Sequence, residues 1–280
     1  MTRSGSLAVA RLDWIAKAGF VARGLVYVLF GTIALTARNR TEDGQRAVFD
    51  ALHDLPLGGV LLVAMALGLV AYGVFRLACG VLDIEGKGST PKGLAGRAAQ
   101  VGSGLFHLAI AWTAAQFIDG ASAHAGNRNS ETAARTLLDL QFGDIGQWSV
   151  AAGCFFAAGL QVRKAFKGSH MKQCAADTPE IARHIGRVGL ITRGLIFAVI
   201  GWSFIRVADT DRPGEAQSAG AAVASLQGYP ALYTAVALGL ILFGVFSLLL
   251  ARYRVVPAID VAQAAKVTAR KVKATVEDKL

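Results

Sequence analysis

Residues 17–37 read KAGFVARGLVYVLFGTIALTA, and the same pattern returns twice further along the chain. Residues 97–117 read RAAQVGSGLFHLAIAWTAAQF, and residues 187–207 read RVGLITRGLIFAVIGWSFIRV. Shifts of 80 and 170 positions align a basic residue at the start of each stretch and a Gly-Leu pair inside it. The aligned residues are Lys17, Arg97 and Arg187, then Gly24, Gly104 and Gly194, then Leu25, Leu105 and Leu195. This agreement predicts an internal repeat.

A second apolar segment follows each copy and repeats as well. It is rich in glycine, and it reads LGLVAYGVF at 67–75, AGCFFAAGLQ at 152–161 and LGLILFGVF at 238–246. The repeating unit is therefore predicted to be a helical hairpin, used three times.

The composition is that of an integral membrane protein. Hydrophobic residues make up 54% of the chain and charged residues only 17%, whereas soluble domains carry about 25% charged residues. A membrane-spanning helix needs about 20 mostly apolar residues, and helices satisfy their own backbone hydrogen bonds in lipid. We therefore expect an all-α, polytopic membrane protein in which three tandem hairpins are arranged with pseudo-threefold symmetry. Its six expected spans are residues 17–37, 57–82, 97–117, 145–163, 187–207 and 229–251.

The spans divide the chain into three hairpins separated by linkers. The expected divisions are a cytoplasmic segment at 1–16, hairpins at 17–82, 97–166 and 187–254, cytoplasmic linkers at 83–96 and 167–186, and a basic cytoplasmic tail at 255–280. We also expect short helices on the opposite side, at 43–55, 130–140 and 215–226, and a helix in the tail.

The formal net charge of +10 could indicate a nucleic-acid partner, but the charges are unevenly placed. The segments on the side of the two termini carry 19 Lys and Arg residues, and the other side carries seven. The positive-inside rule then places both termini in the cytoplasm, as expected for the bacterial cytoplasmic membrane. The expected partners of this charge are anionic lipid headgroups, and no nucleic acid. The amino end lacks the pattern of a removable signal peptide, so we expect the first span to be retained.

The repeated motifs carry a resemblance to a known family. A (K/R)xGxxxRG motif occurs at 17–24 and 187–194, LxxLPxG at 52–58, and GLxxYG at 68–73. The chain in this respect resembles DUF1206, a bacterial family of unknown function whose members are similar in having a transmembrane helix pair repeated three times. The resemblance covers about residues 12 to 254, and the second copy departs from it at Ala99, Ser103 and Gln141. It implies the membrane fold but no catalytic or binding residue.

Two arginines inside the spans are the sharpest candidates for a site. Arg23 and Arg193 occupy equivalent positions in the first and third copies, and Ser103 takes that position in the second. An arginine this close to the membrane face can extend its side chain to phosphate headgroups. If the three positions instead face a common cavity, two cations and a hydroxyl would favour an anion.

The remaining candidates are weaker. Arg76 is expected to reach the headgroups from the end of the second span, and its counterparts are taken to be Val162 and Ser247. His107 lies inside a span, but a haem normally needs a second axial ligand and none is evident. The three cysteines form no CxxC motif, so they support neither a metal site nor a disulfide framework. No cluster of Ser, Cys or carboxylate residues has the arrangement of a catalytic site, and we expect no cofactor.

We therefore expect a non-enzymatic membrane protein of unknown molecular role, with a structural or interaction role in the cell envelope. A membrane protein partner or a second copy of the chain would be its partner. The main alternative is a transporter of small solutes or anions with its site at the repeat interface, and a membrane enzyme comes third. A polar cavity reaching the middle of the membrane would favour transport, and a dry centre packed by glycines would favour the structural role.

Overall fold

A computed structural model describes residues 3–36, 58–118, 128–139, 143–172 and 174–255. Within these ranges the chain is helical, and no strand forms apart from an isolated bridge between Cys174 and Arg254. Each of the six apolar segments expected from the sequence forms a long helix. These are α1 (Arg3–Thr36), α3 (Gly58–Val81), α4 (Pro91–Ile118), α6 (Gly143–Lys167), α7 (Ile181–Thr210) and α9 (Pro230–Tyr253).

Short helices connect the long ones. They are α5 (Arg128–Leu138), α8 (Ala219–Ala224) and the 3₁₀ turns η2 (Ser169–Met171), η3 (Pro213–Glu215) and η4 (Ser225–Gly228). Two of the three short helices predicted between spans are thus present, as α5 and as α8 with its flanking 3₁₀ turns. The third, at 43–55, and the predicted tail helix lie outside the described residues. Gln147 ties α5 to α6, because its side-chain Nε2 donates to the Ala134 carbonyl at 2.6 Å.

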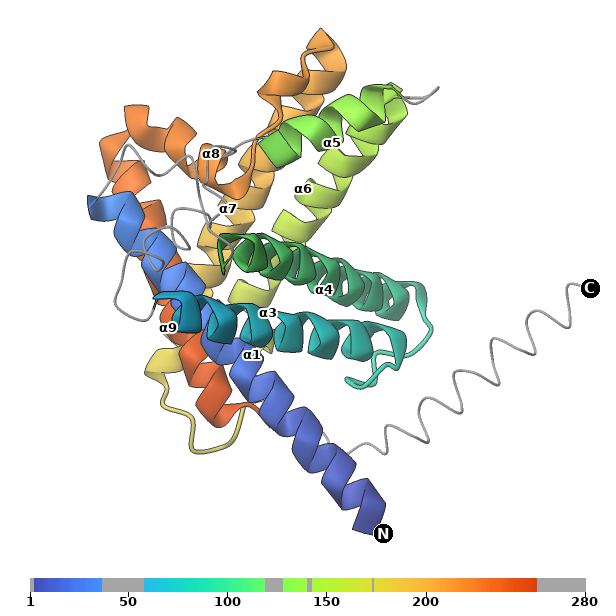
Figure 1. Cartoon of the computed structure of the whole chain (residues 1–280), viewed down its shortest axis with the longest axis vertical. Coiled ribbons are helices and arrows are strands. Elements are labelled where there is room, and N and C mark those ends of the chain that lie inside the picture. Colours follow the sequence, from blue (N-terminus) through green and yellow to red (C-terminus); the bar gives the residue numbers. More distant parts are fainter. Residues whose placement is uncertain (1–2, 37–57, 119–127, 140–142, 173, 256–280) are drawn as a thin grey trace, which may run out of the picture.

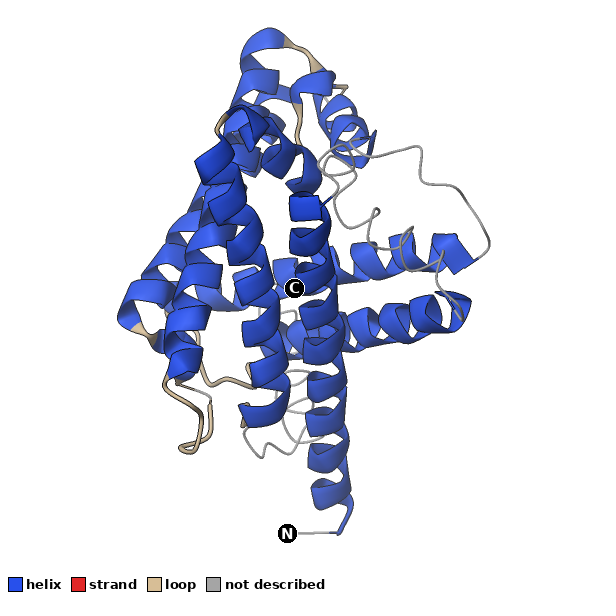
Figure 2. Ribbon diagram, turned by 90° about the vertical axis from the view of Figure 1, so that its left-hand side faces the viewer, coloured by secondary structure: helices blue, strands red, loops and turns tan. Residues whose placement is uncertain are grey.

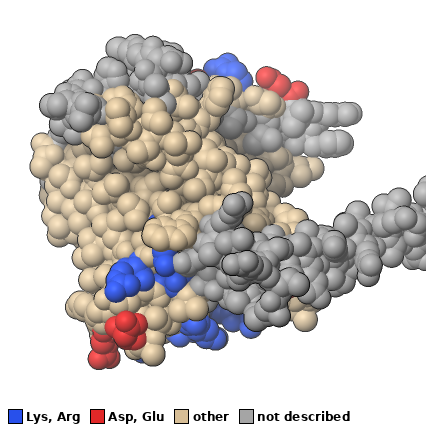
Figure 3. Space-filling model, turned by 60° about the horizontal axis from the view of Figure 1, so that its bottom comes forward, with Lys and Arg blue, Asp and Glu red and all other residues tan. Residues whose placement is uncertain are grey.

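Five of the described helices are long and apolar enough to cross a membrane: Trp14–Thr36 of α1, α3, most of α6, α7 and α9. The chain is therefore a multi-pass membrane protein. The predicted span at 97–117 forms α4, which is not among these five, so the count of six remains a prediction. Figure 3 shows most of the visible Lys and Arg side chains toward one end of the molecule, a broad surface without charge, and both basic and acidic side chains at the opposite edge.

The long helices pack in a definite order. Three pairs join different repeats, namely α3 with α4, α6 with α7, and α9 with α1. Two pairs join the helices of one repeat, α1 with α3 and α7 with α9 (Figure 1). The resulting order is α4, α3, α1, α9, α7 and α6, with α1 and α9 in the middle.

The three pairs between repeats are built in the same way. In each pair, a glycine of the first helix of one repeat lies against a branched side chain and a backbone carbonyl of another repeat. A Cβ added to that glycine would lie 2.7–3.2 Å from the branched side chain. The side chains that face Gly24, Gly104 and Gly194 are Leu248, Leu77 and Val162. The threefold relation predicted from the sequence is thus present in the packing.

The second repeat departs from the other two, because α4 and α6 do not pack along each other. In Figures 1 and 2 the pair formed by α3 and α4 runs across the direction of the remaining long helices. Most of the apolar part of α6 is left exposed within the described residues. In the described residues the ring of three copies is therefore open between α4 and α6.

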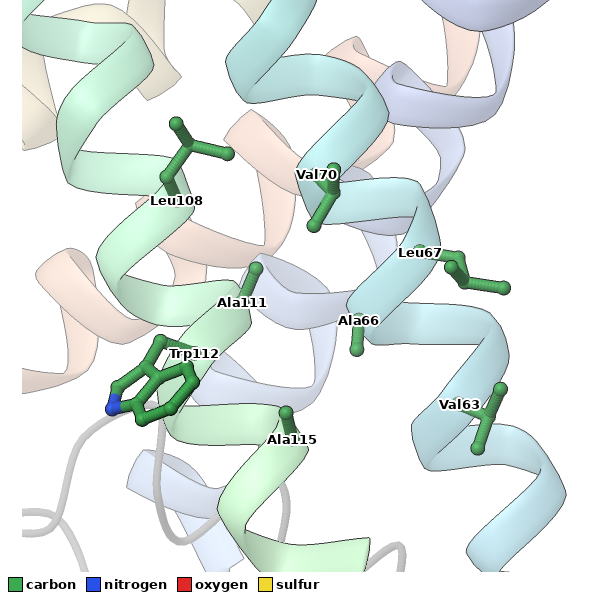
Figure 4. Close-up of a pocket in the computed structure, with 8 residues that line it drawn as sticks. All are labelled: Val63, Ala66, Leu67, Val70, Leu108, Ala111, Trp112 and Ala115. Atoms are coloured by element: carbon green, nitrogen blue, oxygen red, sulfur yellow. The ribbon is translucent and has the colours of Figure 1, made fainter.

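An apolar groove lies between α3 and α4 along part of their length. At the equivalent points of the other two pairs, Gly31 approaches the Ala237 carbonyl and Gly201 approaches the Ala151 carbonyl, but α4 carries Ala111 there. Ala111 therefore adds a methyl group at a point where the other two pairs have a glycine. The groove has a volume of 340 Å³, and Figure 4 shows the two rows of side chains that line it: Val63, Ala66, Leu67 and Val70 from α3, and Leu108, Ala111, Trp112 and Ala115 from α4.

Candidate functional site

Arg23 joins three helices at the centre of the bundle. Its side chain projects from α1 and is only 5% exposed. Its Nε donates to Ser247 Oγ of α9 at 3.1 Å, and its Nη1 donates to the Tyr72 hydroxyl of α3. Arg23 does not reach out to the headgroups, so the interpretation of this side chain as a surface anchor is wrong.

Aromatic rings complete the surroundings of this guanidinium. Its Cζ lies 4.9 Å from the ring centroid of Phe20, 4.6 Å from that of Tyr72 and 5.0 Å from that of Phe243. Ring faces attract a cation, and the attraction grows where water is excluded. No carboxylate of the described part of the chain pairs with Arg23. Its charge is therefore balanced by hydroxyl dipoles and ring faces.

Arg193 lies on the same aromatic ring. Its Cζ is 4.6 Å from the ring centroid of Phe243 and 5.4 Å from those of Tyr27 and Phe197. The side chain is half-buried, so it is less enclosed than that of Arg23. The structure thus brings the two arginines singled out in the sequence to one aromatic ring, that of Phe243.

Ser103 does not join them. It lies on α4, where its carbonyl oxygen is 2.7 Å from His107 Nδ1. Among the described residues, no hydrogen bond links the Ser103 hydroxyl to either arginine. His107 is 1% exposed and packs edge-on against Tyr72, with 4.5 Å between ring centroids. Its Nε2 is buried and has no hydrogen-bond partner in the described ranges.

The packing also corrects the alignment of Arg76. Because Leu77 and Val162 occupy equivalent positions, the counterpart of Arg76 in α6 is Gln161, whereas the sequence alignment gave Val162. At each of the three interfaces between repeats, these equivalent positions hold one arginine and one neutral polar residue, and Arg23 and Ser247 are hydrogen-bonded to each other. The combinations are Arg23 with Ser247, Arg76 with Ser103, and Arg193 with Gln161.

Tyr72 and Ser247, the hydrogen-bond partners of Arg23, were missed because tyrosine and serine are ordinary packing residues in a span.

A second polar cluster lies at the end of α3 and holds one carboxylate. Glu85 accepts hydrogen bonds from Arg254 Nη2 and Gln100 Nε2, each at 2.6 Å, and from Lys87 Nζ. Arg76 Nη1 is 4.0 Å away. Burial alone would raise the pKa of Glu85, but Arg254, Lys87 and Arg76 outweigh it and lower the pKa to about 2. The ionised Glu85 therefore ties the loop after α3 to α4 and to the end of α9.

Neither cluster offers a set of metal ligands. No group of three or more His, Cys, Asp and Glu side chains that could hold a metal ion occurs in the described ranges. The central cluster offers cationic donors and ring faces, which can hold helices together or attract an anion.

Comparisons with known proteins agree with the repeat. The family described as Domain of Unknown Function (DUF1206) matches the chain three times, at residues 18–83, 98–168 and 188–254. The chain is also similar to the Uncharacterized protein YxxB of Bacillus subtilis (strain 168), with 30% identity over 257 residues, which cover 86% of this chain and 92% of that protein. No solved structure matches. Three family matches, each covering one helix pair of the structure, show that this multi-pass membrane protein belongs to the DUF1206 family.

Proposed function

We propose that this protein is a non-enzymatic component of the bacterial cytoplasmic membrane that acts by binding other membrane components. The packing around Arg23 carries the proposal. Two of its nitrogens donate to Tyr72 and Ser247, and three rings enclose it, so the centre of the bundle is filled by the protein itself. A filled centre with close glycine contacts favours a structural or interaction role.

The exposed apolar surface supports the same proposal. Trp112 on α4 is 69% exposed and borders the apolar groove. Aromatic residues are enriched where membrane and protein partners meet. A photo-reactive amino acid at Trp112, in cells, is expected to give a defined adduct with a membrane protein or with a second copy of the chain. The same group at the buried Phe30 is the control. Adducts with lipid alone would contradict an interaction role for this surface.

Both termini are proposed to lie in the cytoplasm, where the 19 basic residues can attract anionic headgroups. Reporter fusions after Gly44, Gly126 and Gly214 are expected to give an external signal. A cytoplasmic signal at all three positions would overturn this orientation.

Anion binding is the second candidate function, and one observation favours it. Arg23 and Arg193 share the Phe243 ring with no carboxylate paired to either in the described residues, and the nearby His107 Nε2 is unpartnered. Such a cluster carries a net positive charge that could attract an anion.

Thermal unfolding in detergent distinguishes the two candidates. Phosphate, sulfate and acetate, added at matched ionic strength, are expected to leave the midpoint unchanged if the centre is only structural. A rise in the midpoint that Arg193→Gln abolishes would establish the anion site. Arg252→Gln is the control, because Arg252 lies at the end of α9, over Tyr253.

A further inference from the structure

Among the described residues, the facing sides of α4 and α6 lack a partner. Within these ranges, no atom outside their own helix backbone lies within 4 Å of where a Cβ would stand at Gly102 of α4 or Gly153 of α6. In the most apolar part of α6 only 17% of the residues are buried, against 44–56% in the other four apolar helices. Both faces are therefore open.

The other two repeats show what such faces contact. A glycine of the second helix lies directly on a small residue of the first, so that a Cβ on the glycine would be 2.5 Å from Ala22 Cβ in repeat 1 and 2.8 Å from Thr192 Cβ in repeat 3. The positions equivalent to these two contacts in repeat 2 are the two open glycines. The equivalent sets are Ala22, Gly102 and Thr192 on the first helix, and Gly68, Gly153 and Gly239 on the second.

A second contact explains why repeat 2 differs. In repeats 1 and 3 an aromatic residue of the second helix fits against a glycine of the first, with Tyr72 on Gly19 and Phe243 on Gly189. Repeat 2 has Ala99 in place of the glycine and Ala157 in place of the aromatic ring. Its interface would bury far less apolar surface, and burial of a large ring is a major source of packing energy.

We propose that α4 and α6 close on each other in the membrane, with Gly102 against Gly153 and Ala99 against Ala157. This contact completes the ring of three repeats. It is also the seam at which the bundle opens sideways, because no aromatic side chain fills it. Closure places Ser103 at the level of Arg23 and Arg193. The proposal does not depend on either candidate function.

Disulfide cross-linking tests the closure. Cysteines bond when their Cα atoms are about 4.4–6.8 Å apart. In a chain whose three native cysteines are replaced by Ala, the pair Ala99→Cys/Ala157→Cys changes only two small residues and leaves both glycines in place. The pair Gly102→Cys/Gly153→Cys probes the glycine contact itself. Oxidation in native membranes is followed by mass spectrometry of the linked peptides and by a non-reducing gel.

Matched pairs set the scale. Ala22→Cys/Gly68→Cys and Thr192→Cys/Gly239→Cys probe the contacts already made in repeats 1 and 3. Ala99→Cys with Gly159→Cys is the negative control, because the α3 residue equivalent to Gly159 is Val74, which is 47% exposed and faces outward.

Closure predicts linked peptides within one chain for Ala99→Cys/Ala157→Cys, at a yield comparable to the two positive controls. No link, with both positive controls formed, would overturn the proposal. A link found only between two chains would overturn it too, since α4 would then pack on α6 of a second copy.

Introducing the glycine and aromatic contact that repeat 2 lacks tests the seam separately. The variant Ala99→Gly/Ala157→Phe copies the Gly189 and Phe243 arrangement into repeat 2. It is expected to raise the thermal midpoint and the yield of the link between cysteines at 102 and 153. An unchanged midpoint and yield would contradict the seam.

Discussion

Replacing Tyr72 by Phe removes one oxygen from the centre of the bundle and keeps the ring. That oxygen is the acceptor for Arg23 Nη1. The ring of the variant can still lie under the guanidinium and against Phe20 and His107, so the change isolates the hydrogen bond from the packing.

The loss in the free energy of unfolding depends on how much this hydrogen bond contributes. Hydrogen bonds between membrane helices contribute about 0.6 kcal/mol on average, but those to a charged group contribute about 1.5–3 kcal/mol. The second estimate applies here, because Arg23 is 5% exposed and water cannot replace the lost acceptor. We therefore expect Tyr72→Phe to lower the free energy of unfolding by about 2 kcal/mol.

Equilibrium unfolding in mixed micelles with increasing dodecyl sulfate, followed by tryptophan fluorescence, measures this loss. Tyr27→Phe is the matched control, because Tyr27 lies under Arg193 and its hydroxyl has no hydrogen bond to any described residue. Its expected loss is below about 0.5 kcal/mol. Equal losses for the two variants would refute the account of Arg23 as a buried, hydrogen-bonded cation.

Two further substitutions test other parts of the structure. Gly31→Ala would place a Cβ 2.6 Å from the Ala237 carbonyl, so it is expected to cost about 1–3 kcal/mol of unfolding free energy, while Gly59→Ala, in open space, is the control. The pKa of Glu85 is lowered from 4.5 to about 2 in the folded protein. The ionised side chain therefore stabilises the fold by about 3 kcal/mol above pH 4.5, and this stabilisation is lost as the pH falls through 2. Glu85→Gln is expected to lower stability at pH 7 and to flatten its decline between pH 4.5 and 2, and an unchanged pH profile would contradict this account.

The helices and their threefold relation could be predicted because the same residue types recur at equivalent positions in the three copies. Aligned glycines and basic residues locate the hairpins, and long apolar runs locate the helices. Residues that align in the sequence also make equivalent contacts in the structure. Gly189 of α7 aligns with Gly19 of α1, and each glycine lies against a large aromatic residue of the next long helix in its repeat. The sequence alone thus predicted the helices and the threefold repeat of a helix pair, and the contacts between particular helices became visible only in the structure.

The orientation of individual side chains was harder to predict. A helix that is apolar on all sides carries no stripe to show which face is buried, so nothing indicated that Arg23 points to Tyr72 and Ser247. One residue of misalignment turns a helix by about 100°, which is why Arg76 was matched with Val162 and not Gln161. Repeat 2 has Ala99 and Ala157 where the other repeats have a glycine and an aromatic ring, and the importance of these two positions could be recognised only from the contacts of the other repeats.

The central claim is that three copies of one hairpin meet through three equivalent contacts. The most direct measurement is disulfide formation, in native membranes, for the pairs Gly24→Cys/Leu248→Cys, Gly104→Cys/Leu77→Cys and Gly194→Cys/Val162→Cys. The account predicts links within one chain for all three pairs, because all three glycines lie against those side chains. A link in one pair and none in the others would contradict the threefold arrangement.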